Sequence, residues 1–144
     1  MAATPTLEQL ADREIDVTGD EQLDCLANAI YFEARSEPLE GQLAVADVVL
    51  NRTASHRYPD SWCEVIKQKA QFSFVVNGRF PKADKSSLAW KRAKAIAKVA
   101  ADRQIVELPE DVLWYHAYYV APKWRLAMSE VKTIGAHTFY TDQA

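Results

Sequence analysis

The segment from Pro38 to about Thr53 constrains the fold most, because it predicts a helix that is apolar on nearly every side. Proline favours the first turn of a helix, which places the start near Pro38. One stripe of apolar residues recurs at helical spacing and others fill most of the remaining circumference: Leu39, Leu43, Ala46 and Leu50, then Ala44, Val45, Val48 and Val49. Such a helix belongs in the middle of a core. We therefore expect the rest of the chain to pack around it.

A second helix is predicted immediately before this one. Thr18-Gly-Asp-Glu21 matches the capping-box pattern, which predicts a helix start there, and Pro38 ends the helix. The apolar positions fall on one face: Leu23, Leu26, Ala27, Ile30 and Ala34. Glu33 lies at the edge of this stripe, so we expect its carboxyl group to be partly removed from water. Desolvation of that kind raises the pKa of a carboxyl group.

Weaker signals outline the remaining helical part. Residues 1–17 have only scattered apolar positions and are expected to form a flexible N-terminal tail, leaving residues 18–144 as one domain. Ser61-Trp-Cys-Glu64 repeats the capping-box pattern and predicts a short helix to about residue 69. Residues 70–85 are predicted to be irregular. Helical periodicity returns over residues 86–102.

The pattern changes after Pro109. Residues 112–119 and 132–141 are rich in aromatic and β-branched side chains, which favour strands. We predict two antiparallel strands here and find no repeat or linker. The expected fold class is α+β, with a helical body and a small C-terminal antiparallel β-sheet.

Charge and hydropathy exclude several classes of partner. The 144 residues include 17 basic and 20 acidic ones, which leaves no basic excess for a nucleic acid or an anionic membrane. No window approaches the roughly 18 continuous apolar residues that span a bilayer. The first ten residues lack the basic and apolar regions of a secretory signal, so we expect none in this sequence. We expect a monomer with no nucleic-acid and no membrane partner.

Glu33 is the first catalytic candidate, because the sequence lacks the glycine-rich phosphate loops, the serine-nucleophile motif and the zinc-protease motif. A cleft for a sugar polymer needs a protonated carboxylic acid and aromatic faces for the rings. The aromatic candidates are Phe72, Phe74, Trp114, Tyr115, Tyr118, Tyr119 and Trp124. A surface salt bridge for Glu33 and a core role for the aromatics remain the alternative. A metal site would need His116 and His137 to meet across strands, although local hydrogen bonds suit these residues better.

The segment Leu26–Arg52 closely resembles the signature of the SleB-type cell wall hydrolases, a family that includes spore-cortex-lytic enzymes and phage wall-degrading proteins. Further motifs of the family follow in the same order: Tyr58–Cys63, Gln71–Phe74, Tyr115-His116, Pro122-x-Trp124 and Ile134–Tyr140. The resemblance covers roughly residues 23–141. It implies a lysozyme-like or lytic-transglycosylase-like domain acting on the glycan strands of peptidoglycan.

In the family motif the glutamate of Glu-Ala-Arg is the catalytic carboxylate, so the resemblance assigns Glu33 as the acid/base. A lytic transglycosylase needs no second carboxylate and no cofactor or metal, and its products carry 1,6-anhydro-muramic ends. A hydrolase would need a partner carboxylate. Glu37 and Glu40 are nearest in the sequence, but local roles suit them better. For Glu40 that role is to complement a helix dipole.

The resemblance also implies substrate-binding residues, namely Gln71, Ser73, Tyr115 and His116. Strand alternation lets only one of Tyr115 and His116 face the cleft, and the period does not decide which. His137 and Tyr140 are expected to be structural. Of the cysteines, Cys25 and Cys63 match family positions, and we hypothesise a disulfide between them if the protein works outside the cytosol. Composition alone left free thiols as the alternative.

Two other functions remain open at this point. One is a metal-dependent wall amidase that uses His116 and His137, and the other is an inactive glycan-binding module. In either case the expected site of action is the bacterial wall, in the periplasm or outside the cell. Release of a phage-type endolysin by a holin would explain the expected lack of a signal, and a trimmed bacterial enzyme would fit as well.

Overall fold

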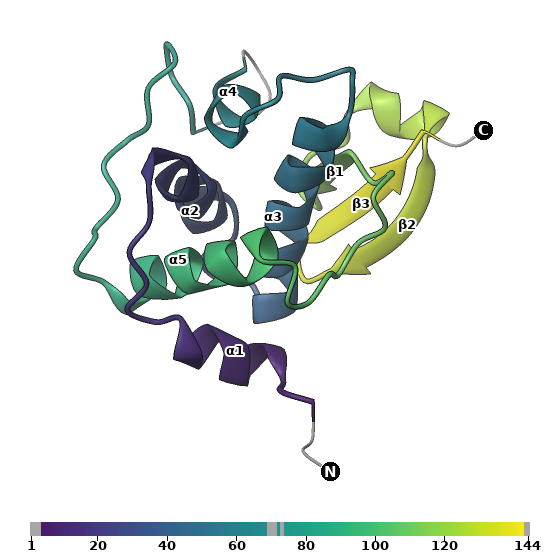
Figure 1. The fold of residues 1–144 in the computed structure, drawn as a ribbon. Helices are drawn as coiled ribbons and strands as arrows, with labels where there is room; N and C mark the ends of the chain where they lie inside the picture. Colours follow the sequence, from purple (N-terminus) through teal and green to yellow (C-terminus); the bar gives the residue numbers. More distant parts are fainter. Residues whose placement is uncertain (1–3, 69–71, 73, 143–144) are drawn as a thin grey trace.

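The computed structural model describes residues 4–68, 72 and 74–142. Its centre is helix α3 (Leu39–Ala54), which separates the other helices from a small β-sheet (Figure 1). On one side Leu43, Ala46 and Val49 pack into the helical core, and on the other Ala44, Val45 and Val48 pack towards the sheet. The prediction of a helix in the middle of the core is confirmed, since residues 41–52 are all buried. Burial of each large side chain contributes about 1.5 to 3 kcal/mol, which outweighs the few tenths that β-branching costs a helix.

The other main helices surround α3 on the side away from the sheet (Figure 1). They are α2 (Glu21–Ala34), α4 (Trp62–Lys67) and α5 (Leu88–Ala101). Ser61 caps α4 as predicted. The N-cap of α2 is Asp20 and not Thr18, because the Asp20 carboxylate accepts the backbone N–H of Leu23.

The N-terminal segment contains a helix that the sequence analysis did not predict. Helix α1 (Leu7–Arg13) begins with a capping box formed by Thr6 and Gln9. Leu7, Leu10 and Ala11 are buried, and they belong to the main core. The expectation of a flexible tail is therefore wrong for residues 7–13. A helix of two turns with three buried positions is too short for its apolar periodicity to be recognised in the sequence.

The sheet has three strands and not the expected two. The strands β1 (Trp114–Ala117), β2 (Ser129–Ile134) and β3 (His137–Thr141) pair antiparallel in the order β1-β3-β2. A 3-10 helix, η1 (Lys123–Ala127), lies between β1 and β2. The second expected strand is in fact a hairpin, because the chain turns at Gly135 with a φ of 55°. Glycine adopts this conformation without the penalty that a side chain brings.

Polar side chains of α3 fasten the segment that leads into β1. The Asn51 amide donates to the carbonyls of Pro109 and Val112, and Arg52 Nε donates to the Leu113 carbonyl over 2.7 Å. The bonds to Val112 and Leu113 satisfy buried backbone carbonyls just before β1. They fix where β1 begins and therefore where Tyr115 lies.

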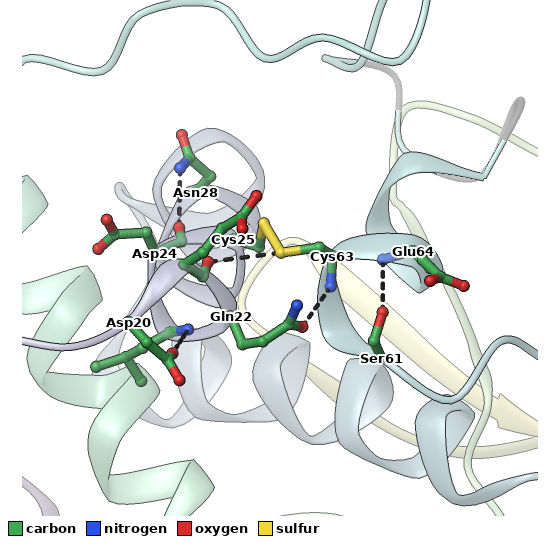
Figure 2. The surroundings of a disulfide bond; sticks show 10 residues. Asp20, Gln22, Asp24, Cys25, Asn28, Ser61, Cys63 and Glu64 are labelled. Carbon is green, nitrogen blue, oxygen red and sulfur yellow. Dashed lines mark hydrogen bonds between the residues drawn. A yellow bond between two sulfur atoms is a disulfide. The ribbon is translucent and has the colours of Figure 1, made fainter.

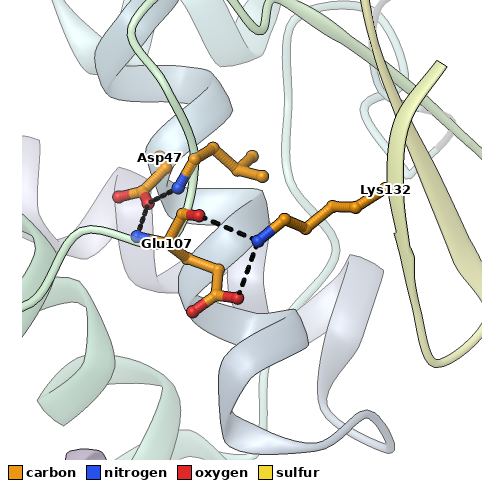
Figure 3. Close-up of polar contacts among 4 residues, drawn as sticks. Asp47, Glu107 and Lys132 are labelled. Carbon is orange, nitrogen blue, oxygen red and sulfur yellow. Dashed lines mark hydrogen bonds and ion pairs between the residues drawn. The ribbon is translucent and has the colours of Figure 1, made fainter.

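A third fastening uses a buried carboxylate of α3 (Figure 3). Asp47 Oδ2 accepts the backbone N–H groups of Glu107 and Leu108 at 2.8 and 3.1 Å. Lys132 of β2 donates to both the carbonyl and the carboxylate of Glu107, at 3.3 Å each. The loop before β1 is thus held between α3 and β2.

A disulfide between Cys25 and Cys63 joins α2 to α4 (Figure 2). The backbone N–H of Cys63 also donates to the Gln22 side chain over 3.1 Å. The hypothesised pairing is therefore present in the structure. None of the helices in the described ranges is both long and apolar enough to cross a membrane.

Candidate active site

The site centres on Glu33, in the last turn of α2. The Tyr115 hydroxyl, on the central part of β1, donates to Glu33 Oε1 over 2.5 Å. The backbone before β1 is held by α3, so the tyrosine is placed by the fold and not by a mobile loop. Of the two adjacent candidates Tyr115 and His116, it is Tyr115 that contacts Glu33.

Burial changes the acidity of both partners in this pair. Desolvation raises the pKa of Glu33, and the hydrogen bond from Tyr115 opposes that shift by stabilising the charged form. Burial also raises the pKa of Tyr115 well above its usual value, and the neighbouring Glu33 charge adds to this shift. Tyr115 is therefore a neutral donor at physiological pH. Glu33 keeps its proton to a higher pH than an exposed glutamate does, as the sequence analysis expected.

Aromatic and cationic groups surround the Tyr115 ring. It lies 5.2 Å from the His137 ring and 5.5 Å from the Phe139 ring, centroid to centroid. The buried guanidinium of Arg52 acts on Tyr115 electrostatically and lies 5.7 Å from the Phe72 ring centre. The apolar neighbours restrict the rotamer of Tyr115, so its hydroxyl remains directed at Glu33.

Glu37 contacts the hairpin between β2 and β3. Its Oε1 accepts the backbone N–H of Ala136 over 2.6 Å and lies 3.7 Å from His137 Nδ1. A Cβ atom at Gly135 would collide with the same Glu37 carboxylate, so this turn requires glycine for space as well as for its φ. Glu40 lies in the first turn of α3, as expected. These positions support local structural roles for both carboxylates.

His116 lies on the opposite face of β1 from Tyr115. Its Nδ1 is 2.9 Å from the Ala117 carbonyl, which can only accept, so this nitrogen carries the proton. Its Nε2 is 2.9 Å from the Tyr140 hydroxyl. The ring stacks on Tyr140 and contacts Trp124. The His116 side chain therefore points away from Glu33. Its expected role in substrate binding stays a prediction.

The metal-site alternative finds little support in this geometry. His137 contacts Tyr115 on the inner face of the sheet, whereas both nitrogens of His116 are engaged on the outer face. Across the described ranges, no group of three or more His, Cys, Asp or Glu side chains is arranged to hold a metal ion. A zinc hydrolase site needs three protein ligands.

The predicted substrate-binding residues Gln71 and Ser73 lie outside the described residues. Their neighbours Phe72 and Phe74 are described, and they belong to a row of aromatic rings. Phe74 stacks on Phe32 of α2 at 5.1 Å and contacts Phe80 at 5.7 Å, centroid to centroid. Phe74 therefore borders the Glu33 end of α2.

Sequence reasoning missed the residues that support the site. Arg52 holds the strand that carries Tyr115 by a hydrogen bond to Leu113, 61 residues away in the sequence. Glu37 holds the hairpin by accepting the N–H of Ala136, 99 residues away. The resemblance placed Arg52 at the end of its longest motif, but no pattern along the chain states which strand it would fasten. Only the folded arrangement shows these roles.

Comparison with known proteins decides the family. The sequence profile described as Cell Wall Hydrolase matches residues 36–140, which is most of the chain. The chain belongs to the cell wall hydrolase family. The resemblance seen in the sequence is therefore confirmed.

Relatives of this cell wall hydrolase domain include curated spore cortex-lytic enzymes. That of Bacillus subtilis is 33% identical over 117 residues, which are 79% of this chain and 35% of the relative. That of Oceanobacillus iheyensis is 47% identical over 57 residues, which are 40% of this chain and 21% of the relative. The chain thus spans well under half the length of these relatives.

Two solved structures share the fold of the domain. One is the catalytic domain of the germination-specific lytic transglycosylase SleB from Bacillus anthracis, with a TM-score of 0.71, 28% identity and coverage of 88% of this chain and 98% of that one. The other is the catalytic domain of Bacillus cereus SleB, with a TM-score of 0.69, 29% identity and coverage of 88% and 94%. The expected fold class, a helical body with a small antiparallel sheet, is confirmed.

Proposed function

We propose that this cell wall hydrolase domain cleaves the MurNAc–GlcNAc bonds of peptidoglycan as a lytic transglycosylase, with Glu33 as its acid/base. The observation that carries the proposal is the buried pair of Glu33 and Tyr115. The pKa of Glu33 is raised by burial, and a neutral tyrosine holds its carboxylate in place. A carboxyl group in this setting can give a proton and take one back near neutral pH.

The reaction uses one carboxyl group twice. Protonated Glu33 gives its proton to the glycosidic oxygen as the bond to muramic acid C1 breaks. The resulting carboxylate then removes the proton from the C6 hydroxyl of the same sugar, and that oxygen attacks C1 to close the 1,6-anhydro ring. Tyr115 stabilises the carboxylate between these steps by its charge-assisted hydrogen bond. Water takes no part, and Glu33 ends the cycle protonated.

Transglycosylation is favoured over hydrolysis by the surroundings of Glu33. Among the described residues, no second carboxylate contributes to the shift in the Glu33 pKa. Glu37, the neighbouring candidate, is engaged by Ala136. Classical glycoside hydrolysis requires two carboxyl groups that flank the bond. The name of the Bacillus anthracis relative supports the same choice.

We further propose that the domain acts on the wall outside the cytosol. The disulfide between Cys25 and Cys63 supports this location, because such bonds persist in oxidising compartments. Export or release by a holin would both deliver the folded domain there. Its partner is the glycan strand, and we propose that it binds as a monomer.

The clearing of suspended, purified peptidoglycan by Glu33→Gln and Glu40→Gln tests the proposal. Both variants exchange a glutamate for its amide, but Glu40 is exposed on α3. We expect Glu33→Gln to lose clearing by at least about 100-fold, as for a general acid/base, while Glu40→Gln and EDTA leave it unchanged. Equal loss in both variants, or loss with EDTA, would overturn the proposal.

A further inference from the structure

A pocket lies beside α2, between this helix and the loop that precedes α5. Its volume is about 440 Å³, and it is lined by Asn28, Phe80, Pro81, Lys82, Ala83 and Lys85. Figure 1 shows this loop running along the outside of α2 on its way from α4 to α5. The pocket walls are apolar, with two lysines at the rim and one buried amide in the wall.

The pocket is close to the catalytic end of α2. Asn28 precedes Glu33 by five residues in α2, which is about 7.5 Å along the helix axis and about 140° around it. The ring row of Phe32, Phe74 and Phe80 links the two places, since Phe32 adjoins Glu33 and Phe80 lines the pocket. This row of rings, at 5.1 and 5.7 Å from centroid to centroid, leads from the residue next to Glu33 round α2 to the pocket.

The lysines at the rim form no ion pair with any acidic side chain that the structure describes. Within the described ranges, neither Lys82 nor Lys85 forms a salt bridge, and both side chains are exposed. The Lys85 ammonium lies 5.5 Å from the Trp90 ring centre, and that of Lys67 lies 5.2 Å from the Phe80 ring centre. Cation–π contacts of this kind restrict a lysine without neutralising its charge.

The charges along the chain are strongly segregated. Residues 65–98 contain nine basic residues and one acidic residue, whereas residues 1–64 contain four basic and thirteen acidic ones. The single acidic residue of the basic stretch, Asp84, accepts hydrogen bonds from Ser86. The described lining of the pocket contains two lysines and no acidic residue, on a protein whose net charge is −3. This local excess favours an anionic ligand.

The buried amide of Asn28 can form a hydrogen bond with a polar group of a ligand in the pocket. Asn28 is 9% exposed, and its Nδ2 donates to the Asp24 carbonyl over 2.8 Å. In Figure 2 its amide oxygen is turned away from that bond. The oxygen is an acceptor suited to a peptide N–H.

We infer that this pocket binds a carboxylate of the acidic stem peptide on the glycan strand, next to the bond that is cleaved. The inference rests on the proposed function. Lys82 and Lys85 pair with the carboxylate, Asn28 accepts a peptide N–H, and the faces of Phe80 and Pro81 contact the apolar part of the peptide. Peptide-bearing glycan is then preferred to glycan whose carboxylates are neutralised.

The test compares two substrates and two double variants. Both substrates are soluble peptidoglycan strands freed of phosphate-containing polymers. In one, the stem-peptide carboxylates are left intact, and in the other they are converted to methylamides. The double variant Lys82→Ala/Lys85→Ala is matched by Lys91→Ala/Lys123→Ala, which removes the same charge at two exposed lysines outside the pocket.

For the pocket variant we expect KM on the intact strands to rise about three- to tenfold, with kcat unchanged, because two exposed ion pairs are lost. On the amidated strands the wild type and the pocket variant should have the same, raised KM. The control variant should match the wild type on both substrates.

Three results would overturn the inference. One is an equal KM of wild type on the two substrates, and another is an equal rise in KM for the control variant. The third is a loss in the pocket variant that appears only when phosphate-containing polymers are left on the wall, which would assign the lysines to those polymers. If wild type releases no glycan product from either substrate, the proposed function itself fails.

Discussion

The Tyr115 hydroxyl lies 2.5 Å from Glu33 Oε1, so that a residue of β1 holds the carboxylate at the end of α2 across 82 residues of sequence. Because Asn51 and Arg52 of α3 hold the backbone before β1, the central helix sets the position of Tyr115. The Glu33 carboxylate is thus held by a residue of the sheet, while burial raises its pKa.

Tyr115→Phe should reduce kcat about 10- to 100-fold, because a hydrogen bond to a charged group contributes about 1.5 to 3 kcal/mol. The bond lowers the Glu33 pKa, so its loss should raise that pKa further. Activity that requires the protonated acid falls as pH rises through this pKa, and the alkaline limb of the profile should therefore move to higher pH. The check is a profile of kcat against pH.

Tyr118→Phe is the matched control for this prediction. It removes the same hydroxyl group from a side chain that is 78% exposed. The control should retain the wild-type profile. An unshifted alkaline limb in Tyr115→Phe would show that the hydroxyl does not act on the titrating group.

The variant Glu37→Gln tests whether the Glu37 carboxylate has a structural role or acts as a second catalytic group. We expect cleavage of peptidoglycan to continue, because the amide oxygen can still accept from Ala136. Glu37→Ala removes the acceptor and should lower the free energy of unfolding by about 1 to 3 kcal/mol. Activity assays and urea titrations on both variants provide the check. Loss of activity in Glu37→Gln with unchanged stability would instead make Glu37 a partner of Glu33.

Removal of the disulfide should destabilise the fold without touching the chemistry. The bond closes a loop between cysteines that are 38 residues apart, for which chain entropy gives about 3 to 4 kcal/mol. In urea, reductant should lower the unfolding midpoint of the wild type to a value near that of Cys25→Ala/Cys63→Ala. Reductant should leave the variant unchanged. A wild-type midpoint that does not respond to reductant would contradict the prediction.

Asp47 should make stability depend on pH. Burial raises its pKa from 3.8 to about 6, although the N–H groups of Glu107 and Leu108 oppose the shift. The folded protein then binds a proton more tightly than the unfolded chain does. The resulting stabilisation is complete below about pH 4 and is lost as pH rises through about 6. A shift of this size corresponds to about 3 kcal/mol.

The check is urea unfolding of wild type and Asp47→Asn between pH 4 and pH 7. The variant cannot titrate at this position, so the stability of wild type relative to the variant should fall by about 3 kcal/mol across the range. Parallel stability curves would show that the carboxylate has the same pKa in the folded and unfolded states.

The helices after α1 were predictable because their signals are local. The apolar circumference of residues 39–54 and the serine cap at Ser61 both depend on residues within one or two turns. The hairpin at Gly135 was missed, since the aromatic and β-branched residues around it continue the strand pattern on both sides. What makes the turn necessary is the approach of Glu37, which lies 99 residues from its partner Ala136 in the sequence.

The site was predictable only in part for the same reason. Periodicity placed Glu33 at the edge of a buried stripe, and the structure confirms the desolvation. Strand alternation let only one of Tyr115 and His116 face the cleft but left the choice open, and the structure shows aromatic contacts on both faces of β1. The choice depends on how the sheet packs against α2 and α3.

The central claim is that Glu33 alone, held by Tyr115, performs the reaction. Mass spectrometry of the soluble products from purified peptidoglycan tests it most directly, with Glu33→Gln digested in parallel. The account predicts wild-type muropeptides that are about 18 Da lighter than hydrolysed ones and have no reducing end, as loss of water on closing the anhydro ring requires. It predicts no such products from Glu33→Gln. Reducing muropeptides, or free stem peptides from intact glycan, would contradict it.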